Sequence, residues 1–289
     1  MNGIAFPFSR KKTKIAGRTL IAAVRAYADK SAPALVKYLN EAGLTDWKDL
    51  TKSNLNDFKD LVTERVAQST ARTYFAVFKT VLKRFEDEAE FCKDYREILT
   101  AKNVKPVKTF LTVEELERLE RVEVLTIPEQ YVLDEFLIGA YTGMRLSDAK
   151  CVSCDNMANG HLSYISKKTG IHAIVPLKKG VAERVERVQR YRRTMSTAGY
   201  NKALRRLCQR AEINERVTVY KAGKSLKGEK WEFISSHSAR ISFATNLSIL
   251  GVQLIDIAKL MGHSSIGMTE RYIVPTQIHL NDVALGFFK

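Results

Sequence analysis

The chain has 289 residues, which is long enough for two domains of ordinary size, each with its own hydrophobic core. Apolar residues make up 45% of it, aromatic residues 9% and charged residues 27%, a composition that excludes a disordered protein. The 47 lysines and arginines against 32 aspartates and glutamates give a formal net charge of +15, which indicates a polyanionic partner such as DNA, RNA or an anionic membrane surface.

The positive charge is spread along the chain and does not form a basic tail. Residues 1–105 contain 20 basic and 13 acidic side chains, and the remaining residues contain 27 and 19. No apolar run approaches the ~20 residues that span a bilayer, and the segment MNGIAFPFSRKKTK lacks the apolar core of a signal peptide. The sequence therefore predicts a cytoplasmic protein without a membrane partner.

The first hundred residues have a helical pattern. From Arg18 to about Leu99, apolar residues recur at spacings of three and four, which predicts four or five helices and no strand. The segment TAKNVKPVKTF that follows is polar, basic and contains a proline, as expected for a connector between domains. We therefore expect one domain over 1–105 and a second over 106–289.

The second domain begins with a helix start signal. Thr112 is followed three residues later by Glu115, the pattern of a capping box. An apolar helix is predicted around EQYVLDEFLIGAYTG, and the alternating segment HLSYISKKTGIHAIVPL predicts two strands joined by a tight turn. The remaining residues return to a helical pattern, with Gly251 and Gly262 at positions where helices end. The expected fold is mainly α with one small β-hairpin.

Cysteine usage indicates neither a disulfide framework nor a metal site. The four cysteines are too few and too scattered for such a framework in a chain of this length; they are Cys92, Cys151, Cys154 and Cys208. Cys151 and Cys154 form a CxxC pair, but no second pair of ligands lies at the spacing of a zinc site. We expect no metal and no cofactor.

A group of polar residues near the C-terminus has the composition of a phosphodiester-cleaving site. Tyr272 follows His263 by nine residues, and His237 and Arg240 lie at i and i+3, which places them on one helix face. A tyrosine alone most often packs its ring on a neighbour. Together with these residues, however, its phenol could attack a DNA phosphate and form a covalent intermediate without ATP or metal, while an arginine stabilises the charge on the phosphate oxygens.

A second arginine and a lysine could complete the set. Arg145 follows a Thr-Gly turn in GAYTGMRLSDAK and could bind the phosphate or form a salt bridge with Asp148 at i+3. The departing 5′ oxygen also needs a proton, which Lys167 or Lys168 on the hairpin turn could supply as a general acid.

These segments resemble the tyrosine recombinases, also called phage integrases. The segments TGMRLSDA, HSARISFAT, LMGHSS and TERYI resemble the family's catalytic boxes in order and spacing over 110–289, and 18–100 resembles, more weakly, the family's small helical DNA-binding domain. The resemblance implies a two-domain clamp around double-stranded DNA, assembled as a tetramer on two recombination sites. Accessory DNA-bending proteins are candidate partners.

The resemblance also implies a role for each site residue. Tyr272 would be the nucleophile that forms a 3′-phosphotyrosyl intermediate, and Arg145 and Arg240 would hold the phosphate. His263 would be a hydrogen-bond partner of the phosphate, His237 the acid/base histidine, and Lys168, just before Thr-Gly, the family's lysine.

The sequence departs from the family at two positions. Ile241 stands where the family commonly has a histidine, which concerns helix packing more than catalysis, and Met144 replaces the leucine of many relatives with a similar volume.

The termini and the biological role allow several interpretations. The apolar segment TQIHLNDVALGFFK could dock on its own domain or on a neighbouring protomer, and the short N-terminal segment predicts no separate arm-binding domain. The favoured function is integration or excision of a phage or mobile element. The alternatives are a chromosome-dimer resolvase, a DNA inversion recombinase, a type IB topoisomerase, and a non-catalytic DNA-binding repressor or clamp.

Overall fold

The computed structural model describes residues 19–102, 108–191, 194–221 and 224–275. The chain divides into two compact units, one formed by residues up to Lys105 and the other by nearly all residues from Pro106 onward. The segments on which the predictions about the N-terminal arm and the C-terminal tail depend, 1–18 and 276–289, lie outside the described residues.

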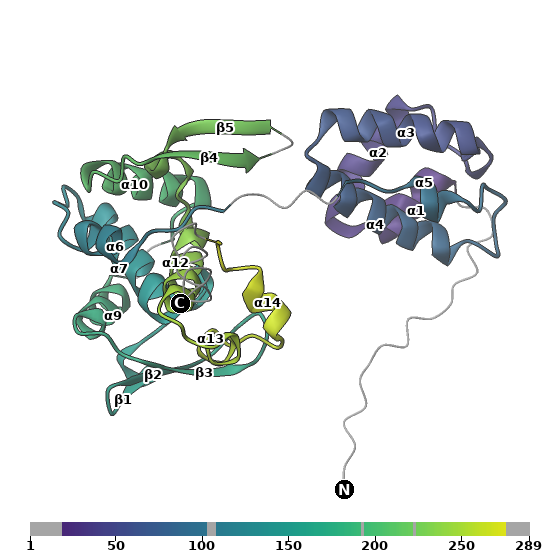
Figure 1. Ribbon diagram of the computed structural model, residues 1–289. Helices are drawn as coiled ribbons and strands as arrows, with labels where there is room; N and C mark the ends of the chain where they lie inside the picture. Colours follow the sequence, from purple (N-terminus) through teal and green to yellow (C-terminus); the bar gives the residue numbers. More distant parts are fainter. Residues whose placement is uncertain (1–18, 103–107, 192–193, 222–223, 276–289) are drawn as a thin grey trace, which may run out of the picture. The chain divides into compact units, whose positions relative to one another are not determined.

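The described part of the N-terminal unit consists of helices joined by loops and contains no strand (Figure 1). Its helices are α1 (Leu20–Tyr27), α2 (Ala32–Glu41), α3 (Lys52–Arg65), α4 (Gln68–Arg84) and the short α5 (Tyr95–Ile98). Its core contains the aromatic cluster Phe58, Phe75 and Phe78, in which Phe58 lies 6.2 and 5.5 Å from the other two rings, centroid to centroid. The prediction of four or five helices without a strand is confirmed for 19–102.

The C-terminal unit contains helices and two small sheets. Its elements, in chain order, are α6 (Val113–Glu120), α7 (Ile127–Thr142), α8 (Leu146–Ala149), β1 (Met157–Ala158), β2 (His161–Ile165), β3 (His172–Pro176), α9 (Val181–Arg190), α10 (Thr197–Arg210), β4 (Arg216–Lys221), β5 (Lys224–Glu229), α11 (Lys230–Phe233), α12 (Ser236–Ile249), α13 (Leu254–Leu260) and α14 (Ile266–Glu270). The predicted capping box of α6 is present, because Thr112 and Glu115 each accept a hydrogen bond from the other's backbone N–H.

Helix α7 is the centre of this unit. The Thr126 hydroxyl caps its N-terminus by accepting a hydrogen bond from the Glu129 N–H, and Gly143, with a φ of +69°, ends it in the left-handed conformation. Most of its side chains are buried, and its residues contribute to both hydrophobic clusters of the unit. A helix that is buried on most of its sides lies inside a core, and the carboxylates of α7 are buried with it.

The predicted hairpin is confirmed, and a second hairpin was missed. β1, β2 and β3 form an antiparallel sheet in which Ser163 pairs with Ile174, and the turn between β2 and β3 contains Lys167 and Lys168. The expectation that only helices follow this hairpin is wrong, since β4 and β5 form a further two-stranded sheet (Figure 1). The alternation of Val217 and Val219 with polar residues was the available signal for β4.

The predicted ends of the last helices are also observed. Gly251 and Gly262 have positive φ angles, +81° and +61°, and follow α12 and α13 directly after their capping residues. None of the helices formed by the described residues combines the length and the apolar composition needed to cross a bilayer.

Candidate active site

Tyr272 lies just after α14, and its backbone is held by α12. Its N–H donates to the carbonyl of Thr269 at 2.7 Å, and its carbonyl accepts from the Thr245 hydroxyl at 3.3 Å. The same hydroxyl accepts from the N–H of Val274 at 3.1 Å. Through Thr245, helix α12 therefore holds the backbone at Tyr272 and at Val274 in place.

Three predicted site residues surround the Tyr272 ring. The ring centroid lies 5.0 Å from the centroid of His237 and 5.1 Å from that of His263, and the Cζ atom of Arg240 lies 5.2 Å from it. His237 and Arg240 come from the first turns of α12, whereas His263 comes from the loop after α13. The fold thus brings together residues that are separated by up to 35 positions in the sequence.

Arg240 is held in place by the protein itself. Its Nη1 donates to the carbonyl of Gly143, and its Nη2 donates to the carbonyl of Met261 at 2.8 Å and to Nε2 of His263 at 2.5 Å. The side chain is 1% exposed, and its Nε has no hydrogen-bond partner among the described residues. Three of the five N–H groups of the guanidinium are therefore used to orient it, and the Nε N–H is not among them.

His263 is a neutral imidazole in this arrangement. Since its Nε2 accepts a hydrogen bond from Arg240, the proton must be on Nδ1, which lies 2.8 Å from the hydroxyl oxygen of Thr269. Burial lowers the pKa of His263 to about 4, and the charges of Arg240 and Arg145 add to the effect. The ring is consequently uncharged near neutral pH.

His237 has a lowered pKa for similar reasons. Burial is the largest cause, followed by the positive charges of Lys108, Arg240, Arg145 and Lys168. An imidazole that remains unprotonated near neutral pH can accept a proton from a neighbouring phenol. The ring contact with Tyr272 places such a phenol next to it.

Arg145 lies two residues after Gly143, the glycine that ends α7. Its Nη1 donates to the hydroxyl of Ser166 at 2.7 Å, and within the described residues it forms no ion pair with Asp148. Ser166 is fully buried between β2 and the hairpin turn. Arg145 is therefore positioned by the hairpin and not by the salt bridge considered from the sequence.

The two turn lysines have different surroundings. The Nζ of Lys167 lies 2.7 Å from Sγ of Cys151, on the side of α8, and its N–H donates to a carboxylate oxygen of Asp148. The charge of Lys168, in contrast, contributes to the lowered pKa of His237. Of the two lysines, Lys168 is thus the one whose positive charge lowers the pKa of a residue beside Tyr272.

Three further residues belong to this region but carry no local sequence signal. The hydroxyl of Ser166 accepts a hydrogen bond from Arg145. Burial raises the pKa of Tyr164, and the positive charge of the nearby Arg240 partly offsets this increase. The Nζ of Lys108 lies 5.5 Å from the centroid of the Tyr272 ring. None of the three forms part of a recognisable motif, so only the tertiary structure identifies them.

The described residues offer no group of three or more His, Cys, Asp or Glu side chains that could hold a metal ion. Ile241, at the position where a histidine is common in the family that the sequence resembles, is buried on α12. The site as a whole offers a phenol nucleophile, neutral imidazoles, two guanidinium groups and a lysine, a set suited to attack on a phosphodiester.

Comparison with known proteins agrees with this chemistry. A family model described as the phage integrase family matches residues 109–278. No curated protein sequence matches the chain significantly.

Several solved structures share the fold. The XerH site-specific recombinase, in a post-cleavage complex with a palindromic difH substrate, matches with a TM-score of 0.64 and 16% identity over 91% of this chain and 80% of XerH. A lambda integrase fragment, as a dimer on a COC′ core site, matches with a TM-score of 0.64 and 16% identity over 88% of this chain and 95% of the fragment. The Tn1549 transposon integrase, in complex with a circular intermediate DNA, matches with a TM-score of 0.60 and 15% identity over 94% of this chain and 100% of the integrase chain.

Proposed function

Because this chain belongs to the phage integrase family, we propose that it is a site-specific DNA recombinase that cleaves and rejoins duplex DNA through Tyr272. The observation that carries the proposal is the convergence of His237, Arg240 and His263 on the ring of Tyr272. The arrangement explains why a partly buried tyrosine that packs against an apolar cluster also lies beside an arginine and two histidines.

In the proposed reaction, the hydroxyl oxygen of Tyr272 attacks the phosphorus of a DNA phosphodiester. A bond forms between that oxygen and phosphorus, the bond from phosphorus to the 5′ oxygen breaks, and the DNA keeps a 3′-phosphotyrosyl linkage. The phenol proton passes to neutral His237, and Lys168 donates a proton to the departing 5′ oxygen. Attack by a 5′ hydroxyl on the phosphotyrosine reverses each step, so no external energy source is required.

Arg145 and Arg240 are the proposed holders of the phosphate. The guanidinium groups would bind the non-bridging oxygens, where negative charge collects in the transition state. Nε of Arg240 lacks a partner among the described residues and is the donor we assign to a phosphate oxygen. Since the Tyr272 ring lies against this buried guanidinium, the ring has to shift when the phosphate enters.

The proposed role of His263 has two parts. With Nε2 as an acceptor it orients Arg240, which is the state in the structure. For the hydrogen bond to the phosphate implied by the family resemblance, the proton must move to Nε2, and the Thr269 hydroxyl next to Nδ1 can then donate instead of accept.

The proposed substrate is double-stranded DNA, bound by both units. XerH, lambda integrase and the Tn1549 integrase were each solved with DNA, and lambda integrase also as a tetramer on a Holliday junction. We propose that 1–105 and 106–289 act as a DNA-binding and a catalytic domain, and that four copies assemble on two sites. Accessory DNA-bending proteins remain candidate partners of this assembly.

A covalent-trapping assay tests the proposal. Wild-type protein and Tyr272→Phe are mixed with labelled DNA from the flanks of the protein's own gene and with an unrelated supercoiled plasmid. We expect a denaturation-resistant adduct with one flanking site for wild type and none for Tyr272→Phe, which loses one hydroxyl and should keep nearly the same DNA affinity.

The other outcomes distinguish the alternatives. Adducts and relaxation on any plasmid would indicate a type IB topoisomerase, and the arrangement of two recovered sites would separate integration from resolution and inversion. Tight binding without any adduct would indicate a non-catalytic DNA-binding protein. Adducts formed equally by Tyr272→Phe would exclude Tyr272 as the nucleophile.

A further inference from the structure

A lysine outside the expected catalytic set faces the nucleophile. Lys108 precedes α6, and its Nζ lies 5.5 Å from the centroid of the Tyr272 ring, a distance similar to the 5.2 Å between Cζ of Arg240 and that centroid. The two residues are 164 positions apart in the sequence, so this contact is a product of the fold.

The segment that carries Lys108 is attached to the helix that carries the site. The N–H of Leu111 donates to the Ser242 hydroxyl at 2.8 Å, and the Leu111 carbonyl accepts from the Asn246 side chain at 3.0 Å. Both partners lie on α12, which also provides His237 and Arg240. Leu111 is fully buried, so the backbone three residues after Lys108 is fixed relative to these catalytic groups.

Lys108 has no acidic partner in the part of the chain that the structure describes. It forms no ion pair with the described residues, and the charged group that most affects it is the cation of Arg271. Burial and that neighbouring charge lower the pKa of the ammonium group. A half-buried cation among other cations is unfavourable unless an anion balances it, and the proposed substrate brings such an anion.

We propose that Lys108 is a further catalytic residue, which binds the phosphate attacked by Tyr272 from the segment leading into α6, together with Arg145 and Arg240. The inference rests on the proposed function. An ammonium group on a four-carbon stem can turn toward a phosphate as the Tyr272 ring shifts, and it offers three hydrogen-bond donors. Lys168 remains the proposed acid for the departing oxygen, so the two lysines have different tasks.

The first test measures binding without cleavage. In a Tyr272→Phe background, Lys108→Met, Lys108→Arg and Lys259→Met are compared by fluorescence anisotropy with a random-sequence duplex over a range of salt concentrations. Lys259 is the matched control, because its exposed Nζ is already paired with Asp256 at 3.2 Å. Loss of one phosphate contact should reduce the slope of the log of the binding constant against the log of the salt concentration by about 0.9. We expect this reduction for Lys108→Met and for neither of the other two variants.

The second test measures adduct formation on the DNA site that wild type cleaves. We expect Lys108→Met to cleave at least about tenfold more slowly and Lys259→Met to stay within about threefold of wild type. Lys108→Arg, which keeps the positive charge, should recover most of the rate that Lys108→Met loses. The acid limb of the pH profile should also move to higher pH in Lys108→Met. The cations facing His237 are Lys108, Arg240, Arg145 and Lys168, and the removal of one raises the pKa of this proposed base.

The outcomes separate this inference from the proposed function. If wild type forms no adduct, the proposed function fails, and the salt dependence of DNA binding still tests whether Lys108 contacts a phosphate. A Lys108→Met protein with unchanged slope and unchanged cleavage overturns the inference. A changed slope with normal cleavage would place Lys108 on DNA away from the scissile phosphate. Equal defects in Lys108→Met and Lys108→Arg, with an unshifted pH profile, would show a structural role only.

Discussion

Arg240 illustrates how single residues prepare this site. Three acceptors hold its guanidinium: the carbonyls of Gly143 and Met261, and His263 Nε2. Donors that are oriented in advance stabilise a transition state without reorganisation during the reaction. One of these acceptors is the carbonyl of the glycine that ends α7, so the geometry of that turn bears directly on the proposed phosphate site.

Gly143→Ala should therefore affect both stability and cleavage. Gly143 has a φ of +69°, and an added Cβ would lie 2.7 Å from the Phe243 ring. We expect a loss of about 2 to 4 kcal/mol in the free energy of unfolding, from left-handed strain plus overpacking, and slower adduct formation. Urea denaturation and the trapping assay measure the two effects.

Gly251→Ala is the matched control for this change. Gly251 also has a positive φ, +81°, but no atom lies within 4 Å of the added Cβ, so only the strain of about 1 to 2 kcal/mol remains. Equal losses of stability in both variants would show that the contact with Phe243 does not affect folding. Equal cleavage rates would show that the Gly143 turn does not affect cleavage through Arg240.

The residues of the site could be predicted only where they lie in local patterns. Tyr272 and Arg240 stand in short segments with recognisable spacing, and the structure brings them together. Lys108 and Ser166 stand in no such pattern, because their positions depend on contacts between distant segments, namely Leu111 with α12 and the hairpin turn with Arg145. Tertiary contacts of this kind leave no periodic signal in one sequence.

At the scale of elements, α7 shows how a buried helix accommodates carboxylates. Asp134 is paired with Arg184 and Arg187, and Glu129 is paired with Arg210 at 2.5 Å. Glu135, on the same helix, is 2% exposed, and its Oε1 has no hydrogen-bond partner among the described residues. Burial raises the pKa of Glu135 to about 7, against a smaller opposing effect of Lys150.

Glu135→Gln should stabilise the protein at alkaline pH. The raised pKa means that the folded state holds a proton that the unfolded state releases, so stability is lost as the pH rises from about 4.5 to about 7. A glutamine keeps the neutral form, and we expect a gain of about 1 to 3 kcal/mol at pH 8 and little change at pH 4.5. Urea denaturation at both values checks this, and an equal effect at both would contradict it.

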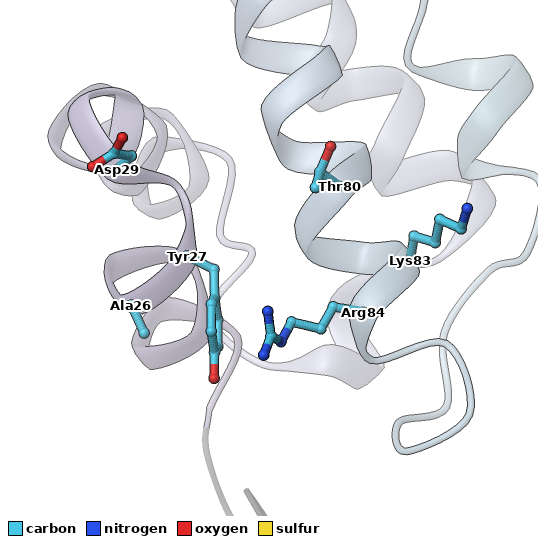
Figure 2. Close-up of a pocket in the computed structure, with 6 residues that line it drawn as sticks. All are labelled: Ala26, Tyr27, Asp29, Thr80, Lys83 and Arg84. Carbon is cyan, nitrogen blue, oxygen red and sulfur yellow. The ribbon is translucent and has the colours of Figure 1, made fainter. Parts of the chain in front are cut away.

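Helix α4 has a basic face suited to a DNA backbone. Its sequence contains no acidic residue, and Lys79, Lys83 and Arg84 form no ion pair with the described residues. Lys83 and Arg84 line a cavity of about 600 Å³ next to α1, where the Arg84 guanidinium lies over the Tyr27 ring at 4.1 Å (Figure 2). The stacking orients one cation of this face.

The pair Lys79→Ala and Lys83→Ala should weaken DNA binding. Each lost phosphate contact is expected to reduce the salt slope by about 0.9, without a preference among DNA sequences. Lys37→Ala is the control, because Lys37 is paired with Glu41 on α2 at 3.8 Å. Anisotropy with one duplex measures all three changes. An identical slope for the pair and the control would exclude this face from the DNA interface.

The elements were predictable where the periodicity is long and were missed where it is short. The helices of 19–102 and the β2–β3 hairpin follow from apolar spacing and turn residues. β4 and β5 are six residues each, and their lysine-rich sequence resembles an exposed loop as much as a strand pair. Such a short signal does not outweigh the helical pattern around it.

At the scale of the whole molecule, the distribution of charge predicts how DNA binding depends on salt. The excess of basic residues is present both in 1–105 and in 106–289, so both units can contribute phosphate contacts. We expect at least six contacts in total and therefore a loss of affinity of about a thousandfold or more between 50 and 200 mM salt. Anisotropy with the Tyr272→Phe protein measures this without covalent trapping. A slope corresponding to only two or three contacts would mean that one unit alone holds the duplex, and the assignment of DNA binding to both units would then be wrong.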